Sequence, residues 1–201
     1  MTSKTIAGVV LAGGKGRRIG GNKPLRTLLG RPLIETVISR TRPQVDALWL
    51  SANSDYAGLE ALDLPIVEDG DGRAGKGPLA GIAAALSIVR DSGFDRLAVV
   101  PCDAPFVPRD LVARLTRSLD AAEAPGVVVR TPQGLQPTFG LWSVDAYEAC
   151  AAALDAGRLR LGSFCHEIGM STLWCGEDPD DAFFNINTSN DLERAESSLA
   201  Q

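Results

Sequence analysis

The chain has 201 residues, of which 45% are hydrophobic and 22% are charged, and its formal net charge is −5. This composition is that of a soluble globular protein, and the length is most simply that of one domain over residues 1–201. The charge is uneven, because residues 1–42 hold nine of the 20 Lys and Arg residues and one acid, Glu35. An acidic chain with a basic first fifth argues for a localised anionic ligand and against a nucleic-acid surface.

No membrane span or export signal is expected. The apolar stretch 6–12 is short, contains Gly8 and runs into glycines and arginines without a cleavage site. The four cysteines lack Cys-x-x-Cys and zinc-ligand spacing; they are Cys102, Cys150, Cys165 and Cys175. We expect reduced, mostly buried thiols, which favours a cytoplasmic protein.

Short apolar runs alternate with helical patterns along the chain. Strands are predicted at residues 6–11, 47–52, 65–68, 96–101, 127–130, 138–142 and 171–175. Helices are predicted at residues 32–40, 78–89, 108–119 and 144–154, and after residue 188, where Ser189 is the expected cap. The alternation predicts a three-layer α/β/α fold with a mostly parallel sheet, which binds ligands outside the carboxyl ends of its strands.

The first predicted strand runs into a loop that is rich in glycines and cations. The glycines are Gly13, Gly14, Gly16, Gly20 and Gly21, and the cations are Lys15, Arg17, Arg18 and Lys23. Glycine N–H groups can approach a ligand closely, and the added cations favour a polyphosphate. Neither P-loop nor Gly-x-Gly-x-x-Gly spacing is present, so a nucleotide would be held in another way. The alternative, a glycine-rich surface turn, leaves the clustered cations unexplained.

Three later stretches also carry candidate chemistry. The segment 77–81, Gly-Pro-Leu-Ala-Gly, begins a helix whose N–H groups favour an anion or a base edge. Asp103 follows a buried strand and suits a Mg²⁺ ion held against triphosphate oxygens. The segment 185–188, Asn-Ile-Asn-Thr, alternates polar and apolar residues. Their structural alternatives are a plain helix start, a turn former, and a β-edge with a helix cap.

The loop resembles the Leu-x-Gly-Gly-x-x-x-Arg-Met-Gly-x-x-Lys signature of nucleotidyltransferases, with Leu11 and Lys23 at its ends and Ile19 in place of Met. Together with the three later motifs, residues 9–193 resemble the molybdenum cofactor guanylyltransferases. That resemblance implies a Rossmann-like nucleotidyltransferase fold. It also implies that GMP passes from GTP to the phosphate of molybdopterin, with Mg²⁺, and that pyrophosphate is released. Molybdenum-insertion proteins and apo-molybdoenzymes are the further partners it implies.

The resemblance also implies roles for individual residues. Nucleotide contacts would come from Leu11, Ala12, Gly13, Gly14, Lys23, Asn53, Asp69 and Asp103, with Glu68 or Asp71 as competitors of Asp69. Arg18, Lys23 and Asp103 would be catalytic, and Asp103 would hold the metal. Asn185 and Asn187 would contact the pterin-bearing substrate.

Two positions depart from the family pattern, because Asn22 replaces an acid before the lysine and Ser189 replaces a proline. The single histidine, His166, is expected on the surface or in packing. Two alternatives stay open. One is a cytidylyltransferase or sugar-phosphate nucleotidyltransferase of the same fold, and the other is a GTP-binding module without turnover.

Overall fold

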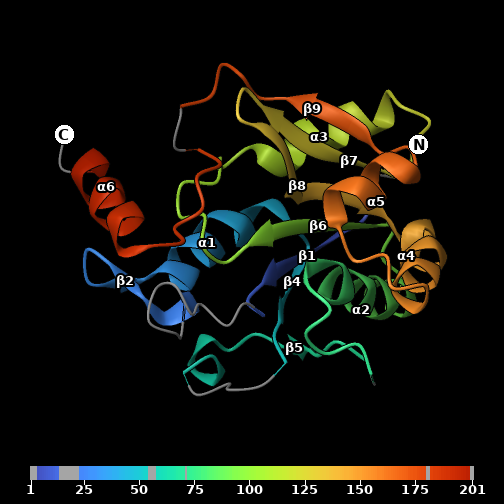
Figure 1. Ribbon diagram of the computed structural model, residues 1–201, viewed down its shortest axis with the longest axis horizontal. Helices are drawn as coiled ribbons and strands as arrows, with labels where there is room; N and C mark the ends of the chain where they lie inside the picture. The colour runs from blue at the N-terminus through green and yellow to red at the C-terminus, as the bar shows by residue number, and fades with distance from the viewer. Residues whose placement is uncertain (1–3, 14–22, 54–57, 71, 180–181, 200–201) are drawn as a thin grey trace.

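The structure is a computed structural model that describes residues 4–13, 23–53, 58–70, 72–179 and 182–199. A seven-stranded sheet in the order β5-β4-β1-β6-β8-β7-β9 lies at its centre (Figure 1). The strands are β1 (Ile6–Leu11), β4 (Ala47–Ser51), β5 (Ile66–Val67), β6 (Arg96–Pro101), β7 (Gly126–Thr131), β8 (Gly134–Ser143) and β9 (Ser171–Trp174). Two further short strands, β2 (Thr27–Leu28) and β3 (Arg31–Pro32), form a separate ribbon.

Among the described strands of the large sheet, β8 alone runs against its neighbours. It pairs antiparallel with β6 and with β7, whereas the other pairs are parallel. Because β8 runs antiparallel to both β6 and β7, the strands β7 and β9 point the same way as β1 and β6. The carboxyl ends of six strands therefore meet at one edge of the sheet, which is where ligands of such folds bind.

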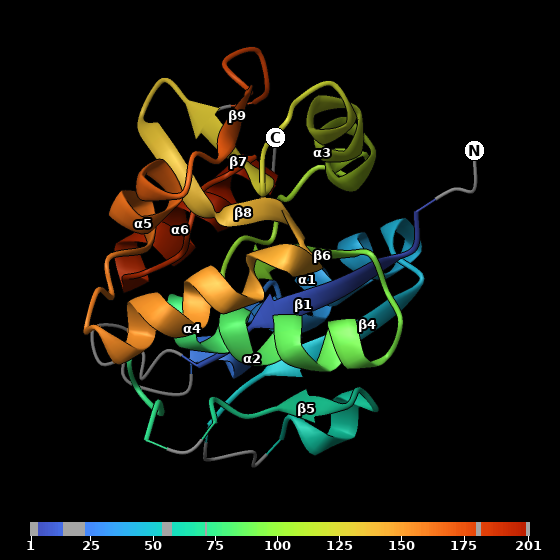
Figure 2. The same ribbon diagram turned by 90° about the vertical axis from the view of Figure 1, so that its right-hand side faces the viewer.

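Helices cover both faces of this sheet. They are α1 (Leu33–Thr41), α2 (Pro78–Asp91), α3 (Leu111–Asp120), α4 (Tyr147–Asp155) and α5 (Leu161–Glu167), while α6 (Ser189–Leu199) packs against β2. Single 3-10 turns are η2 (Lys23–Leu25), η3 (Arg42–Gln44), η4 (Glu60–Leu62) and η5 (Val144–Ala146). One apolar cluster joins α1 and α3 to the sheet, and another joins α2, α4 and α5 to the opposite face. Figure 2 shows α2 and α4 side by side on that second face.

The strands divide their side chains between the two clusters by simple alternation. Val10 and Val100 belong to the cluster with α1 and α3, while Val9 and Val99 belong to the cluster with α2, α4 and α5. Apolar residues at successive positions of β1 and β6 therefore bury both faces, as buried parallel strands require. The predicted three-layer, mostly parallel α/β fold is confirmed.

The structure corrects several details of the prediction. Helix α3 begins at Leu111, three residues later than expected, and β8 begins at Gly134, four residues earlier. The short helix α5 was not predicted. Thr188, and not Ser189, caps α6, because the Thr188 hydroxyl accepts a hydrogen bond from the Asp191 N–H at 3.2 Å. The Asp191 carboxylate accepts one in return from the Thr188 N–H at 2.8 Å, which completes a capping box.

Candidate active site

The residues that follow β1, β4 and β6 are held in line at the carboxyl edge. The Ala12 N–H donates to the Ser51 carbonyl at 2.8 Å, and the Cys102 N–H donates to the Leu11 carbonyl at 3.1 Å. These bonds continue the sheet's pairing one residue past the strands. The next residues along the chain, Gly13 and Asp103, are thereby placed at the same edge.

A cavity of about 280 Å³ opens at the ends of β1, β4 and β5. Its lining residues are Leu11, Gly13, Ser51, Asn53, Asp69, Gly75, Gly77, Pro78 and Gly81. Four residues that are predicted to contact the nucleotide therefore line one cavity, although they come from the ends of three separate strands; they are Leu11, Gly13, Asn53 and Asp69. The Gly-Pro-Leu-Ala-Gly motif joins them through Gly77, Pro78 and Gly81.

Asn53 and Asp69 form the polar floor of this nucleotide-side cavity. Asn53 Nδ2 donates to Asp69 Oδ2 at 2.5 Å, and the Asp69 N–H donates to Asn53 Oδ1 at 2.7 Å. Asp69 is only 8% exposed, and burial raises the pKa of its carboxyl above the usual range, while bonds from Asn53 and the Gly75 backbone oppose the rise. Its competitor Glu68 is exposed and does not line the cavity, and Asp71 lies outside the described residues.

Helix α2 begins at the rim of the same cavity. Gly77 precedes it with a φ of 84°, a conformation that glycine adopts without strain. One turn later, a Cβ on Gly81 would collide with Ser51 Oγ and lie 3.3 Å from Leu11 Cδ2. The helix therefore packs against β4 and β1 as closely as a glycine permits. Its N-terminal dipole consequently adds positive potential to the cavity.

Asp103 lies immediately past β6 and is 7% exposed. Its backbone carbonyl accepts a hydrogen bond from the Ile186 N–H at 2.9 Å, which fixes the Asn-Ile-Asn motif beside it. Within the described residues, no three His, Cys, Asp or Glu side chains gather as metal ligands. A single carboxylate nevertheless fits Mg²⁺, which is held by one or two carboxylates, substrate phosphates and waters.

A second cavity, of about 430 Å³, lies between the β7–β8 turn and the segment after β9. Its lining residues are Thr131, Pro132, Gln133, Gln136, Cys175, Gly176, Asp178, Pro179, Phe183, Phe184, Asn185, Asn187 and Arg194. Both predicted pterin-side residues are among them. Asn187 Nδ2 donates to the Asn185 carbonyl at 3.1 Å, and Asn185 Oδ1 is buried without a hydrogen-bond partner among the described residues. A buried acceptor without a partner invites a ligand donor.

Sequence reasoning missed most of this second, acceptor-side cavity. Gln133 and Gln136 reach it because β8 turns back beside β7, and Arg194 reaches it from α6 with its guanidinium 4.9 Å from the Phe184 ring. No local pattern announces these residues, because their proximity depends on strand order.

Several predicted residues stand elsewhere. Ala12 is buried in the core cluster of α1 and α3 and does not line the cavity. Gly14, Arg18 and Asn22 lie outside the described residues, as does the side chain of Lys23, whose backbone begins η2. The four cysteines are free and buried, as expected, and His166 is exposed on α5. No helix in the described part of the chain is both long and apolar enough to cross a bilayer.

Known proteins that are similar to this chain in sequence and in fold indicate the same family. The model of the MobA-like NTP transferase domain matches residues 8–167. The chain is 42% identical to a molybdenum cofactor guanylyltransferase of Cereibacter sphaeroides, over 96% of this chain and 97% of the relative. It is also 42% identical to a molybdenum cofactor guanylyltransferase of Acidiphilium cryptum, over 95% of this chain and 94% of the relative.

Solved structures give the same picture. The molybdopterin-guanine dinucleotide biosynthesis protein A of Archaeoglobus fulgidus superimposes with a TM-score of 0.77 at 26% identity, over 96% of this chain and 98% of that one. A 4-diphosphocytidyl-2C-methyl-D-erythritol synthase of Anaerococcus prevotii, at 13% identity, shares the fold with a TM-score of 0.76. Because the family model spans most of the chain and the relatives match it nearly end to end, this chain belongs to the MobA-like NTP transferase family.

Proposed function

We propose that this protein transfers GMP from GTP to the phosphate of molybdopterin, forming the guanine dinucleotide cofactor and pyrophosphate. The observation that carries the proposal is that hydrogen bonds of Cys102 and Asp103 tie the end of β6 to the linings of both cavities. The Cys102 N–H donates to the carbonyl of Leu11, which lines the nucleotide-side cavity, and the Asp103 carbonyl accepts from Ile186, between the two asparagines of the acceptor-side cavity. A triphosphate bound in one cavity and a phosphate monoester bound in the other would then approach each other near the end of β6.

The reaction requires few proton transfers. An oxygen of the molybdopterin phosphate would attack the α-phosphorus of GTP, the new P–O bond would form, and the bond to the β-phosphate oxygen would break. A phosphate monoester is largely anionic near neutral pH, since its second pKa is about 6, so no strong general base is needed. This fits a chain whose single histidine, His166, is exposed on α5.

Positioning and charge neutralisation supply the catalysis in such a transfer. We assign phosphate neutralisation to Lys23 and Arg18, together with the N-terminus of α2. Asp103 would hold Mg²⁺, and the bound metal would neutralise triphosphate charge. Asn53, Asp69 and the glycines of the nucleotide-side cavity would orient the guanosine. Asn185 and Asn187 would bind the pterin-bearing substrate.

The choice of guanine has two supports in the sequence. The cytidine-using relatives usually begin Ala-Ala-Gly where this chain has Leu11-Ala12-Gly13-Gly14, and the Gly-Pro-Leu-Ala-Gly element also suits the guanine branch. Molybdenum-insertion proteins and apo-molybdoenzymes would be the partners before and after the transfer. The free thiols support a reducing compartment, and hence the cytoplasm, as the place of the reaction.

A nucleotide panel with pyrophosphate as the readout tests this function. With Mg²⁺ and molybdopterin, GTP should be preferred to CTP and ATP by at least about tenfold in kcat/KM, or roughly 1.4 kcal/mol. Faster release of pyrophosphate from CTP than from GTP would instead make this protein a cytidylyltransferase. Binding of GTP without pyrophosphate release would make it a regulatory module.

A further inference from the structure

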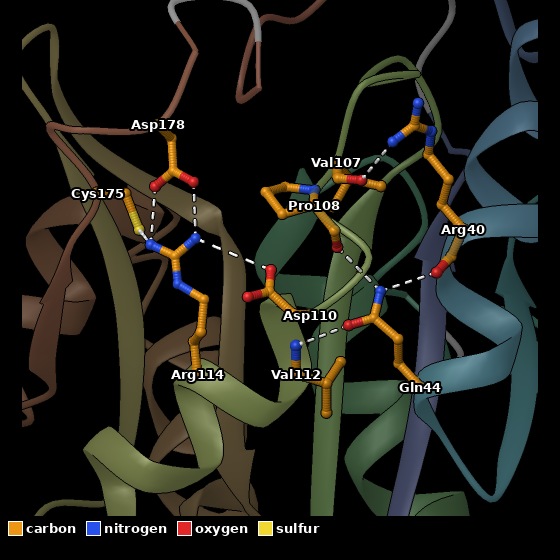
Figure 3. Close-up of polar contacts among 9 residues, drawn as sticks. All are labelled: Arg40, Gln44, Val107, Pro108, Asp110, Val112, Arg114, Cys175 and Asp178. Carbon is orange, nitrogen blue, oxygen red and sulfur yellow. Dashed lines mark hydrogen bonds and ion pairs between the residues drawn. The ribbon is translucent and has the colours of Figure 1, made fainter.

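Arg114 of α3 forms hydrogen bonds with the segment that follows β9 (Figure 3). Its Nη1 donates to Asp178 Oδ1 and its Nη2 to Asp178 Oδ2, both at 2.7 Å, and Nη2 also lies 3.1 Å from Cys175 Sγ. The Arg114 and Asp178 side chains are 20% and 15% exposed. The ion pair is bidentate and largely buried, so it fixes the relative position of the two side chains far better than an exposed ion pair does.

The two residues that Arg114 contacts belong to the wall of the acceptor-side cavity. Cys175 and Asp178 line that cavity, whereas Arg114 does not and holds them from behind. The wall has no regular secondary structure between the end of β9 and Ser189 in the described residues. Backbone bonds tie it near its two ends, from the Cys175 N–H to the Arg130 carbonyl and from the Ile186 N–H to the Asp103 carbonyl. Arg114 ties the part between them.

The charges and the thiol in this cluster keep fixed states at neutral pH. The guanidinium of Arg114 holds the pKa of Asp178 below its usual range, with partial burial opposing the shift. Burial raises the pKa of Cys175 to about 11, so its sulfur stays a neutral thiol. The pair is therefore a constant feature of the cavity wall over the pH range in which an enzyme of this kind would be assayed.

The first turn of the same helix, which carries Arg114, is also anchored to α1 and η3. Gln44 Oε1 accepts from the Val112 N–H at 2.9 Å, and its Nε2 donates to the carbonyls of Pro108 at 3.0 Å and Arg40 at 2.8 Å (Figure 3). These bonds fix the start of α3, at the end of the segment that follows Asp103, against α1 and η3. The first turn of α3 is thus held on one side by Gln44 and holds the wall of the acceptor-side cavity, through Arg114, on the other.

We propose that the Arg114–Asp178 pair is a positioning pair for the acceptor substrate, which sets the shape of the acceptor-side cavity relative to Asp103. The inference rests on the proposed function only for the identity of the acceptor, molybdopterin. Neither Arg114 nor Asp178 lines the nucleotide-side cavity, so loss of the pair should weaken acceptor binding and leave nucleotide binding unchanged.

Asp178→Asn tests the pair, because it keeps the shape of the side chain and removes its charge. We expect KM for molybdopterin to rise about tenfold, since a displaced wall misplaces its ligand, while kcat at saturation stays within about threefold. The Kd of GTP, measured by titration, should stay within about twofold. Arg114→Met should behave in the same way, and Arg114→Lys, which keeps the charge without the fork, should give an intermediate KM.

Asp155→Asn is the matched control. It removes the same charge from a pair with Arg73 at 2.9 Å, which ties the loop of the nucleotide-side cavity to α4. The KM for molybdopterin should not change in this variant. An unchanged acceptor KM in Asp178→Asn, or a parallel rise in both Michaelis constants with a fall in Tm, would overturn the proposal, because the pair would then be inert or generally structural.

The failure of the proposed function would look different. Wild-type protein would then bind molybdopterin without releasing pyrophosphate, or would not bind it at all. In the first case the Kd of molybdopterin replaces KM as the test of Asp178→Asn, with the same expected rise. Absence of molybdopterin binding by the wild type would overturn both the proposed function and the role of the pair.

Discussion

Asn53 and Asp69 exchange two hydrogen bonds across the carboxyl ends of β4 and β5, one to the Asp69 carboxylate and one from its backbone N–H. The carboxamide of Asn53 uses a donor and an acceptor in this exchange, so its orientation is fixed. The arrangement joins two strand ends with a single side chain and aims the buried carboxylate of Asp69 at the nucleotide-side cavity.

Replacing Asn53 by Ala should therefore impair nucleotide binding. The Asp69 N–H and carboxylate would each lose a partner, and an unpaired buried polar group costs about 1–3 kcal/mol. We expect the Kd of GTP, measured by calorimetric titration, to rise by about tenfold or more. A GTP affinity equal to that of the wild type would show that the exchange is dispensable.

Asp69→Asn should change stability in a pH-dependent way. A raised pKa means that the folded state binds the Asp69 proton more tightly than the unfolded chain, whose value is near 3.8. Wild-type stability is therefore lowered by this group as pH rises above 3.8, and the loss is complete above the folded-state pKa. The variant lacks this penalty, so its Tm should exceed that of the wild type at pH 8.

That gain in Tm should shrink towards zero as the buffer is taken below pH 4, and GTP turnover should fall although stability rises. Thermal melts between pH 4 and pH 8 give the comparison. A variant that is less stable than the wild type at every pH would mean that the hydrogen bonds outweigh the burial of the charge.

Gly81→Ala should destabilise the protein, against the usual preference of helices for alanine. The added Cβ collides with Ser51 Oγ and lies close to Leu11 Cδ2, so either the Ser51 hydroxyl must rotate away or α2 must shift from β4. We expect a loss of about 1–3 kcal/mol, the usual cost of overpacking, measured by urea unfolding. Combining it with Ser51→Ala should recover most of the loss.

Gly162→Ala is the control for this steric argument. Gly162 lies in α5, and the nearest atom to its added Cβ, Leu135 Cδ2, is 3.9 Å away. Its unfolding free energy should stay equal to that of the wild type or rise slightly. Equal effects of the two alanine substitutions would refute the collision.

Asp103→Ala should lower turnover by about a hundredfold or more, because triphosphate charge would lose its proposed metal anchor. The fold should survive, since the residue lies past the end of β6. Initial rates over a Mg²⁺ titration, with circular dichroism as the control for folding, test the assignment. Activity retained at saturating Mg²⁺ would remove Asp103 from the metal site.

Thr188→Val should destabilise α6 by about 1 kcal/mol, because the Asp191 N–H loses its capping acceptor. Ser189→Ala, one residue later, should have an effect within about 0.5 kcal/mol, the usual range for surface changes. Urea unfolding of the two variants distinguishes the cap that is present from the one that the sequence suggested.

The layered fold was predictable because its signals are local. The apolar runs of β1 and β6 and the apolar α2 are buried on both sides, and glycine loops mark where strands end. The start of α3 was not predictable, since a side chain from η3, Gln44, holds its first turn. Helix α5 was missed because its seven residues follow a glycine-containing loop, although Leu161, Phe164 and Cys165 show the buried face of a helix.

The lining of the nucleotide-side cavity comes largely from motifs that the sequence displays, whereas the lining of the acceptor-side cavity does so only in part. Asn185 and Asn187 stand in a recognisable motif. Gln136, Arg114 and Asp178 come from separate elements that meet only because β8 is inserted between β6 and β7. Strand order is a long-range property, so no window of sequence reports it.

The single reversed strand also has a practical consequence for attaching this enzyme to a support or to another protein. In the large sheet, all described strands but β8 run towards the cavities, so the start of β1, where Thr5 is hydrogen-bonded to Asp95, lies at the opposite edge of the sheet. Helix α6, by contrast, contributes Arg194 to the acceptor-side cavity. A tether placed ahead of β1 would therefore leave from the edge opposite both cavities, whereas one placed after α6 would pull on a helix that lines the acceptor-side cavity.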